Sequence, residues 1–110
     1  MNLVNCVIVT YFPDIKSLEN LILGMQSQVE NIIICDNSPS NYHIGIKENS
    51  RIKIYKLSKN TGIAKAQNIG LDHSFNNGAK YVVTMDQDSL PEKDLVENCG
   101  SNSRLWQCKS

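Results

Sequence analysis

The sequence predicts an α/β fold in which a mostly parallel β-sheet is covered by helices on both faces. Four short apolar segments, each long enough for one strand, alternate with stretches whose apolar residues recur at helical spacing. Apart from the third, these apolar segments are continuous rather than alternating, which is typical of strands buried on both faces, as in parallel sheets. The expected order is strand, helix, strand, strand, helix, strand.

The first strand and the first helix occupy the N-terminal part of the chain. Residues 3–10 are rich in Val and Ile and predict a buried strand. Pro13 breaks this strand, and Asp14 is placed to cap the N-terminus of a helix. The apolar residues of this helix recur on one face, which we expect to lie against the sheet: Ile15, Leu18, Leu21, Ile22 and Met25.

Two strands follow without a helix between them. Residues 31–36 contain three consecutive Ile residues and a Cys, which predicts a second buried strand, and the turn-forming residues 37–41 end it. Residues 51–57 alternate apolar residues with lysines, the pattern of a strand near the edge of a sheet. The polar stretch before this third strand is expected to be irregular.

The second helix and the fourth strand complete the predicted unit. Residues 61–75 are expected to form the helix, and Asn77 and Gly78 end it because both accept the left-handed conformation of a C-cap. Residues 80–85 form the fourth apolar strand. The helix is expected to pack on the sheet through Ile63, Ala66, Ile69 and Gly70.

The chain changes character after Pro91. A short helix can start at Glu92, but the sequence beyond it is polar, and Trp106 either packs onto the domain or is disordered. We therefore expect two parts, an α/β unit at residues 1–91 and a tail at residues 92–110, a short helix or irregular, that adds no further layer.

The composition excludes several classes of protein. The chain has 110 residues, enough for one modest domain, and its formal net charge of zero creates no field that attracts nucleic acid. No apolar stretch is long enough to span a bilayer and the N-terminus does not resemble a signal peptide, so we expect a cytoplasmic protein. The four Cys residues have no metal-binding or redox spacing.

Polar residues stand where the predicted strands end. The first strand ends at Thr10 and Tyr11 and the second at Asp36, while residues 60–62 follow the third strand and open a helix. The carboxyl ends of parallel strands share one edge, where open α/β folds bind ligands. Asp36 and Tyr11 suit a nucleoside, and the helix N-terminus suits a phosphate. The alternatives are a turn between Asp36 and Ser38, a simple helix cap at Asn60 or Thr61, and close packing at Gly62.

The fourth strand ends in two carboxylates, Asp86 and Asp88, one residue apart. Two carboxylates so close repel each other unless a cation lies between them. Mg²⁺ and Mn²⁺ take oxygen ligands and share them with substrate phosphates, so the pair predicts metal-held phosphate chemistry. A solvated acidic turn is the alternative reading.

Four segments together resemble the inverting glycosyltransferases of family 2, and are most similar to the bacterial rhamnosyltransferases of that family. These segments are residues 7–11, 32–38, 60–70 and 85–89, in family order and at family-like spacing. The resemblance covers residues 3–91. It implies a Rossmann-like sheet that forms the N-terminal, donor-binding half of a GT-A fold.

The resemblance also implies roles at the carboxyl edge. Thr10, Tyr11 and Asp36 are expected to line the nucleoside pocket, with Asp36 reading the pyrimidine edge. Asp86 is expected near the ribose as a second metal ligand, and Asp88 as the main ligand of a Mg²⁺ or Mn²⁺ ion. This ion is expected to neutralise the diphosphate leaving group.

The ribose and diphosphate are expected beside the second helix, near Asn60, Gly62 and Asn68. The implied donor is a nucleoside-diphosphate sugar, dTDP-L-rhamnose for this branch. The implied acceptor is a cell-surface polysaccharide or a lipid-linked precursor, so the full-length protein is expected at the inner face of the bacterial membrane. Read alone, Asn68 is more often a solvated helix residue than a ligand.

Two departures from the family qualify this expectation. Phe12 stands where the family often has Asn. The chain also stops soon after the Asp-x-Asp element, and Asp94 and Glu97 are too close to it to be the base that deprotonates the acceptor. We therefore expect no catalytic base here, and an isolated chain that binds nucleotide weakly and transfers no sugar.

Other classes of protein explain the sequence less well. A dehalogenase-type phosphatase usually has Thr or Val where Leu90 stands, and an EF-hand needs an oxygen ligand and a Gly at Leu90 and Pro91. A non-catalytic α/β nucleotide-binding or interaction domain is the strongest alternative. A chain of this size buries only a marginal apolar core, so the formation of homo-oligomers through exposed surface is a further alternative.

Overall fold

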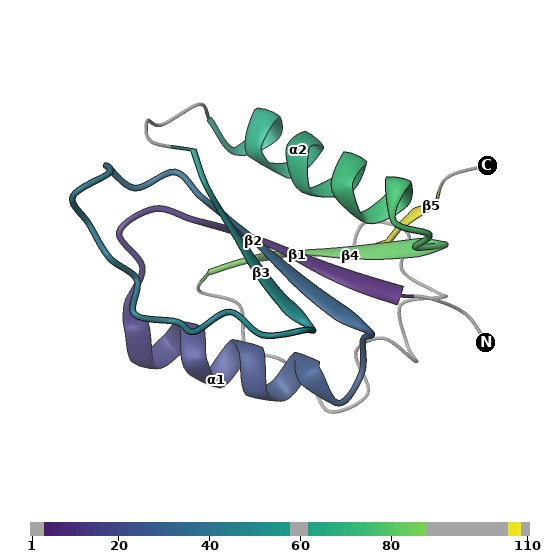
Figure 1. Cartoon of the computed structure of the whole chain (residues 1–110), viewed down its shortest axis with the longest axis horizontal. Helices are drawn as coiled ribbons and strands as arrows, with labels where there is room; N and C mark the ends of the chain where they lie inside the picture. The colour runs from purple at the N-terminus through teal and green to yellow at the C-terminus, as the bar shows by residue number, and fades with distance from the viewer. Residues whose placement is uncertain (1–3, 58–61, 88–105, 109–110) are drawn as a thin grey trace.

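The computed structural model describes residues 4–57, 62–87 and 106–108 of the chain. The described part consists of one β-sheet with a helix on each face (Figure 1). The elements in chain order are β1 (Val4–Thr10), α1 (Ile15–Gln26), β2 (Asn31–Asp36), β3 (Ile52–Lys56), α2 (Ile63–Asn76), β4 (Tyr81–Asp86) and β5 (Trp106–Cys108).

The sheet has the strand order β3-β2-β1-β4-β5. Strands β1 to β4 are parallel, with β1 between β2 and β4, and β3 pairs with β2. The predicted parallel α/β fold is therefore confirmed, and β3 lies at an edge as its alternating sequence indicates. The four carboxyl ends meet at one edge of the sheet, where the sequence places its candidate site.

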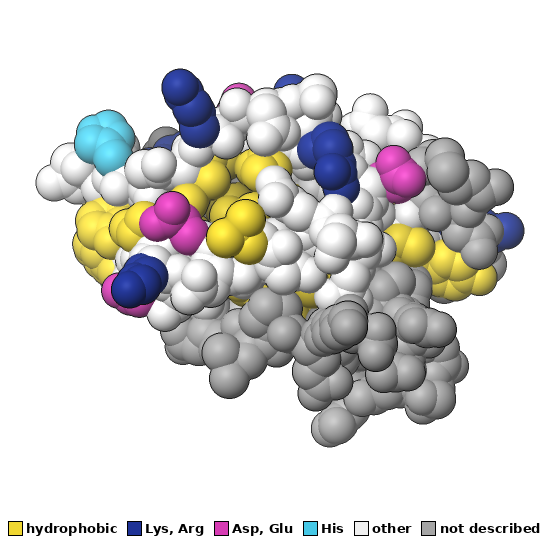
Figure 2. All heavy atoms as spheres, turned by 90° about the horizontal axis from the view of Figure 1, so that it is seen from below, with side chains coloured by type: hydrophobic (Ala, Val, Ile, Leu, Met, Phe, Trp, Pro, Cys, Tyr) yellow, Lys and Arg dark blue, Asp and Glu magenta, His cyan; other side chains and the backbone are white. Residues whose placement is uncertain are grey.

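The predicted apolar face of α1 is confirmed. Leu18, Leu21, Ile22 and Met25 are buried against the sheet, and Ile15 packs on the same cluster. Asp14 caps the helix, since its carboxylate accepts hydrogen bonds from the backbone N–H and the hydroxyl of Ser17 at 3.1 and 2.7 Å. The outer side of this layer shows hydrophobic side chains between charged ones (Figure 2).

Helix α2 packs closely on the opposite face because one of its residues has no side chain. A Cβ atom at Gly70 would lie 2.6 Å from Cγ1 of Val7 and 3.1 Å from Sγ of Cys35, so only glycine allows this approach. Ala66 is buried and Ile69 partly buried in this layer, as predicted.

The prediction that Ile63 packs on the sheet is wrong. Ile63 is 61% exposed, because it is the first residue of α2 and the buried stripe begins one turn later, at Ala66. The helix also begins after the predicted residue 61, and its N-cap is Gly62. Its end agrees with the prediction, with Asn77 as the C-cap and Gly78 at φ 98°.

Strand β5 was not predicted from the sequence. It falls within the expected tail, 92–110, and pairs antiparallel with β4. The helix expected from Glu92 lies outside the described residues. Within the part of the chain that the structure describes, neither helix has the length and apolar character needed to cross a bilayer.

Candidate functional site

Three polar side chains form a row across the carboxyl ends of β1, β2 and β3. Thr10, Asp36 and Lys56 are successive partners in the parallel register. The Thr10 hydroxyl donates to Oδ1 of Asp36 at 2.9 Å, and Nζ of Lys56 donates to Oδ2 of Asp36 at 2.8 Å. We call this row the polar ladder; it places a charge pair at the edge where the sequence predicts a nucleoside pocket.

Asp36 is fully buried and ionised at the centre of the polar ladder. Burial alone would raise the pKa of this carboxyl, but hydrogen bonds from Lys56, Ser38 and Thr10 outweigh it and hold the pKa below its usual range. The backbone N–H of Ser38 donates to Oδ1 of Asp36 at 3.0 Å, so the predicted turn is present. A role for Asp36 in reading a base stays a prediction.

The loop after β1 carries exposed aromatic rings over this edge. Tyr11 and Phe12 are each 48% exposed, and Phe12 contacts Tyr11 and Tyr42 edge to face, with centroids 4.8 and 4.9 Å apart. Phe12 has φ 44°, a strained value for a bulky residue. We call these three residues the aromatic cluster.

Hydrogen bonds from other elements hold the aromatic cluster in place. The backbone N–H of Phe12 donates to the Ser38 hydroxyl at 2.7 Å. The Tyr42 hydroxyl donates to the Pro13 carbonyl at 2.9 Å, and the Tyr42 carbonyl accepts from Lys56. The aromatic cluster and the polar ladder are therefore connected, and a change in one is expected to displace the other.

Gln87 attaches the end of β4 to the same loop. Its Oε1 accepts from the backbone N–H of Tyr11 at 2.7 Å, and its Nε2 donates to the carbonyl of Tyr11 at 3.1 Å. The side chain thus pairs with both backbone groups of Tyr11 as a neighbouring strand would. This role was not predicted from the sequence, although the position of Gln87 between two carboxylates marks it as unusual.

The predicted metal site is described only in part. Asp86 ends β4 opposite Val9 of β1 and is exposed, whereas Asp88 lies outside the described residues. Among the residues that are described, no group of three His, Cys, Asp or Glu side chains could hold a metal ion. Metal binding by Asp86 and Asp88 therefore stays a prediction.

Two of the residues expected near the ribose and diphosphate are described, Gly62 as the N-cap of α2 and Asn68 within that helix. A Cβ atom at Gly62 would meet no other atom within 4 Å, so it is the φ of 89° alone that requires glycine there. The Gly62 carbonyl accepts from the side-chain amide of Asn37 at 3.4 Å, which connects α2 to the end of β2. Asn68 is exposed on α2, and Asn60 lies outside the described residues. Contacts of these residues with a donor stay predictions.

The buried cysteines are not nucleophiles. Burial raises the pKa of the Cys6 thiol to about 12 and that of the Cys35 thiol to about 11. Both thiols are therefore neutral at physiological pH and act as small apolar side chains.

Known proteins resemble this chain in sequence and in fold. Residues 6–99 match the family model described as Glycosyl transferase family 2. A protein named dTDP-rhamnosyl transferase RfbF, from Shigella flexneri, is 36% identical over 93 residues, which are 83% of this chain and 31% of that protein. This chain therefore spans about a third of the length of that curated relative.

Two crystal structures of S. aureus TarS have the same fold as this chain. The structure of residues 1–349 matches with a TM-score of 0.70 and 17% identity, over 90% of this chain and 31% of that one. The second structure matches with a TM-score of 0.64 and 15% identity, over 90% of this chain and 19% of that one. The predicted fold class is thereby confirmed.

Proposed function

Because this chain belongs to glycosyl transferase family 2, we propose that it is the donor-binding part of a rhamnosyltransferase that uses dTDP-rhamnose. The name of the Shigella relative supports this donor. The observation that carries the proposal is a pair of neighbouring contacts at the end of β1, Thr10 with Asp36 and Tyr11 with Gln87. They lie at the carboxyl edge of a parallel sheet, where α/β folds bind nucleotides.

The nucleoside is proposed to lie over β1 and β2. The exposed ring of Tyr11 offers a flat face on which a pyrimidine can stack. Thr10 and Asp36 form the floor of this pocket, with Asp36 below the pyrimidine edge. Gln87 contributes by holding the backbone of Tyr11 at both its N–H and its carbonyl.

The diphosphate is proposed to lie between the end of β4 and the start of α2, near Asn60, Gly62 and Asn68. The exposed carboxylate of Asp86 fits a hard cation, and Asp88 follows two residues later. A Mg²⁺ or Mn²⁺ ion held by these two residues would neutralise the diphosphate as it leaves.

Acceptor binding is proposed to require sequence beyond these 110 residues. The acceptor is a polysaccharide or a lipid-linked precursor at the inner face of the membrane, and the general base that deprotonates its hydroxyl belongs to the remaining part of the enzyme. The isolated chain is therefore expected to bind the donor and to transfer no sugar.

Calorimetric titration with dTDP, with and without Mn²⁺, tests this proposal. We expect binding that strengthens at least tenfold with Mn²⁺, because the ion bridges the carboxylates and the diphosphate. Asp88→Ala should remove the metal dependence, while Asp72→Ala, which removes an exposed carboxylate on α2, should not change it. A dTDP affinity that is the same with and without Mn²⁺ would favour the alternative of a non-catalytic nucleotide-binding domain. Absence of binding by the folded protein at millimolar dTDP would refute the proposal.

A further inference from the structure

Lys56 is the member of the polar ladder that a ligand can reach. Asp36 has no exposed surface, whereas 30% of the Lys56 side chain is exposed. An ammonium group has three donor hydrogens, and among the residues that the structure describes there are two acceptors for it, Oδ2 of Asp36 and the carbonyl of Tyr42. A ligand at this end of the site would therefore meet a cation fixed in position by the buried carboxylate.

The pairing of charges decides what Lys56 can bind. A cation 2.8 Å from a carboxylate has most of its long-range field cancelled, so it attracts a phosphate weakly. Its remaining hydrogen-bond donor keeps its direction and can bind a neutral carbonyl oxygen. Lys56 is thus suited to a carbonyl group rather than to the diphosphate.

The strand order decides which part of a nucleotide reaches Lys56. Asp86 ends β4, whereas Lys56 ends β3, three strand spacings away, which is roughly 14 Å. If the diphosphate lies at β4, the nucleoside extends across β1 and β2, and the edge of the base farthest from the ribose meets β3. In uracil and thymine that edge carries the O4 carbonyl, and in cytosine it carries an amino group, a donor.

We propose that Lys56 is a specificity-determining residue that donates a hydrogen bond to O4 of a uracil or thymine base. Asp36 acts through it as a positioning residue, so recognition of the pyrimidine edge does not require an exposed Asp36. This inference rests on the proposed function, because the direction of the nucleoside follows from a diphosphate at β4. Cytosine is rejected because its amino group would face the Lys56 ammonium, donor against donor.

Titration of UDP and CDP in the presence of Mn²⁺ tests this proposal, since their bases differ only in the group on C4 and in the proton on N3 beside it. The wild-type chain should bind UDP about tenfold more tightly than CDP, the ratio expected for one hydrogen bond to a charged group. Lys56→Gln should bring the two affinities within about threefold, because an amide both donates and accepts. Lys56→Arg, which only donates, should keep the preference. Lys53→Gln changes an exposed lysine on the other face of β3 and is the matched control.

A second measurement does not depend on the folding of any variant. A pyrimidin-2-one nucleoside diphosphate lacks O4 and the N3 proton, as CDP does, but has no amino group, and it should bind the wild-type chain about tenfold more weakly than UDP. Equal binding of these two ligands, or an unchanged ratio of UDP to CDP affinity in a folded Lys56→Gln chain, would overturn the role assigned to Lys56. Neither result would contradict the proposed function. Absence of all nucleotide binding by the wild-type chain would instead overturn the proposed function and this inference together.

Discussion

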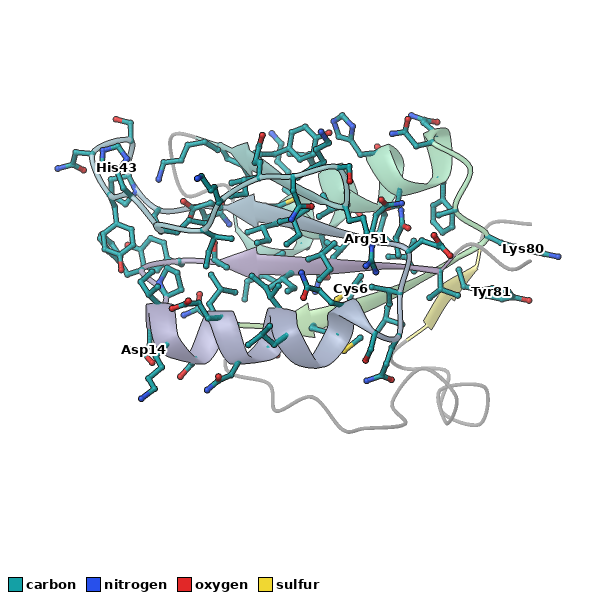
Figure 3. The ribbon with its side chains drawn as sticks, turned by 60° about the horizontal axis from the view of Figure 1, so that its bottom comes forward. Cys6, Asp14, His43, Arg51, Lys80 and Tyr81 are labelled. Carbon is teal, nitrogen blue, oxygen red and sulfur yellow. The ribbon has the colours of Figure 1, made fainter. Side chains whose placement is uncertain are left out.

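The two ends of the parallel sheet are both closed by polar contacts, but the contacts differ in kind. At the amino end, the guanidinium group of Arg51 donates to the backbone carbonyls of Gln26, Val29 and Glu30, at and just beyond the end of α1. At the carboxyl end, side chains bond to one another and to the loop after β1. Figure 3 shows Arg51 at the amino end and His43 near the carboxyl end.

This difference between the two ends of the sheet distinguishes a polar network that only supports the fold from a candidate binding site. At the amino end, Arg51 donates to backbone carbonyls at and beyond the end of a helix. Every helix leaves its last carbonyls without a partner inside the helix, so such contacts are explained by structure alone. The carboxyl end instead buries a charge at Asp36, keeps Phe12 in a left-handed conformation and exposes two aromatic rings. Each of these features is less stable than a well-packed apolar or relaxed alternative would be, so their presence together favours the proposed binding site.

The largest expected effect comes from removing the buried charge at the carboxyl end. Asp36→Ala leaves Lys56, Thr10 and the Ser38 N–H without their shared acceptor, and should lower the free energy of unfolding by about 3 kcal/mol. Urea denaturation measures this loss, and Asp72→Ala is the exposed control. A loss no greater than that of the control would show that the polar ladder does not stabilise the fold.

An intermediate effect is expected at the amino end. Arg51→Met removes the donors to three carbonyls and should lower the free energy of unfolding by about 1 kcal/mol, because the side chain is exposed. Nucleotide affinity should be unchanged, since Arg51 lies at the far end of the sheet. Lys53→Met, at another exposed cation of the same segment, is the control. A loss of nucleotide affinity in Arg51→Met would remove the distinction between the two ends.

The smallest effect is expected at Phe12, where strain and ring contacts oppose each other. Both Phe12→Asn and Phe12→Ala lose the two edge-to-face contacts, but Asn adopts a left-handed conformation more readily than Ala. The Asn variant should therefore be more stable than the Ala variant by roughly 0.5–1 kcal/mol in thermal unfolding. Equal stability would show that φ at residue 12 relaxes when the ring is removed.

The sequence predicted the fold because apolar continuity and helical spacing are local signals. The four parallel strands, the edge position of β3 and the buried face of α1 follow from such patterns. Two features did not follow. Ile63 has the right spacing to be buried but begins its helix, and β5 is only three residues long, too short for a recognisable pattern.

The candidate site was predicted in its location but not in its contacts. Thr10, Tyr11 and Asp36 follow or end predicted strands, and the carboxyl ends of parallel strands lie at the same edge of a sheet. Their common location could therefore be predicted from the parallel topology alone. The roles of Lys56 and Gln87 depend on side chains that contact residues of other strands. The spacing of residues along the chain does not show which side chains are in contact, so these roles could not be predicted.

The placement of β4 beside β1 has a consequence for the order of folding. Thr10 pairs with Asp36 after 26 residues, whereas Val4 pairs with Tyr81, 77 residues later in the chain. Closing the longer loop costs about 1 kcal/mol more in chain entropy, so contacts between β1, β2 and β3 are expected to form early and those with β4 late. The polar ladder would then be complete before Gln87 reaches the backbone of Tyr11.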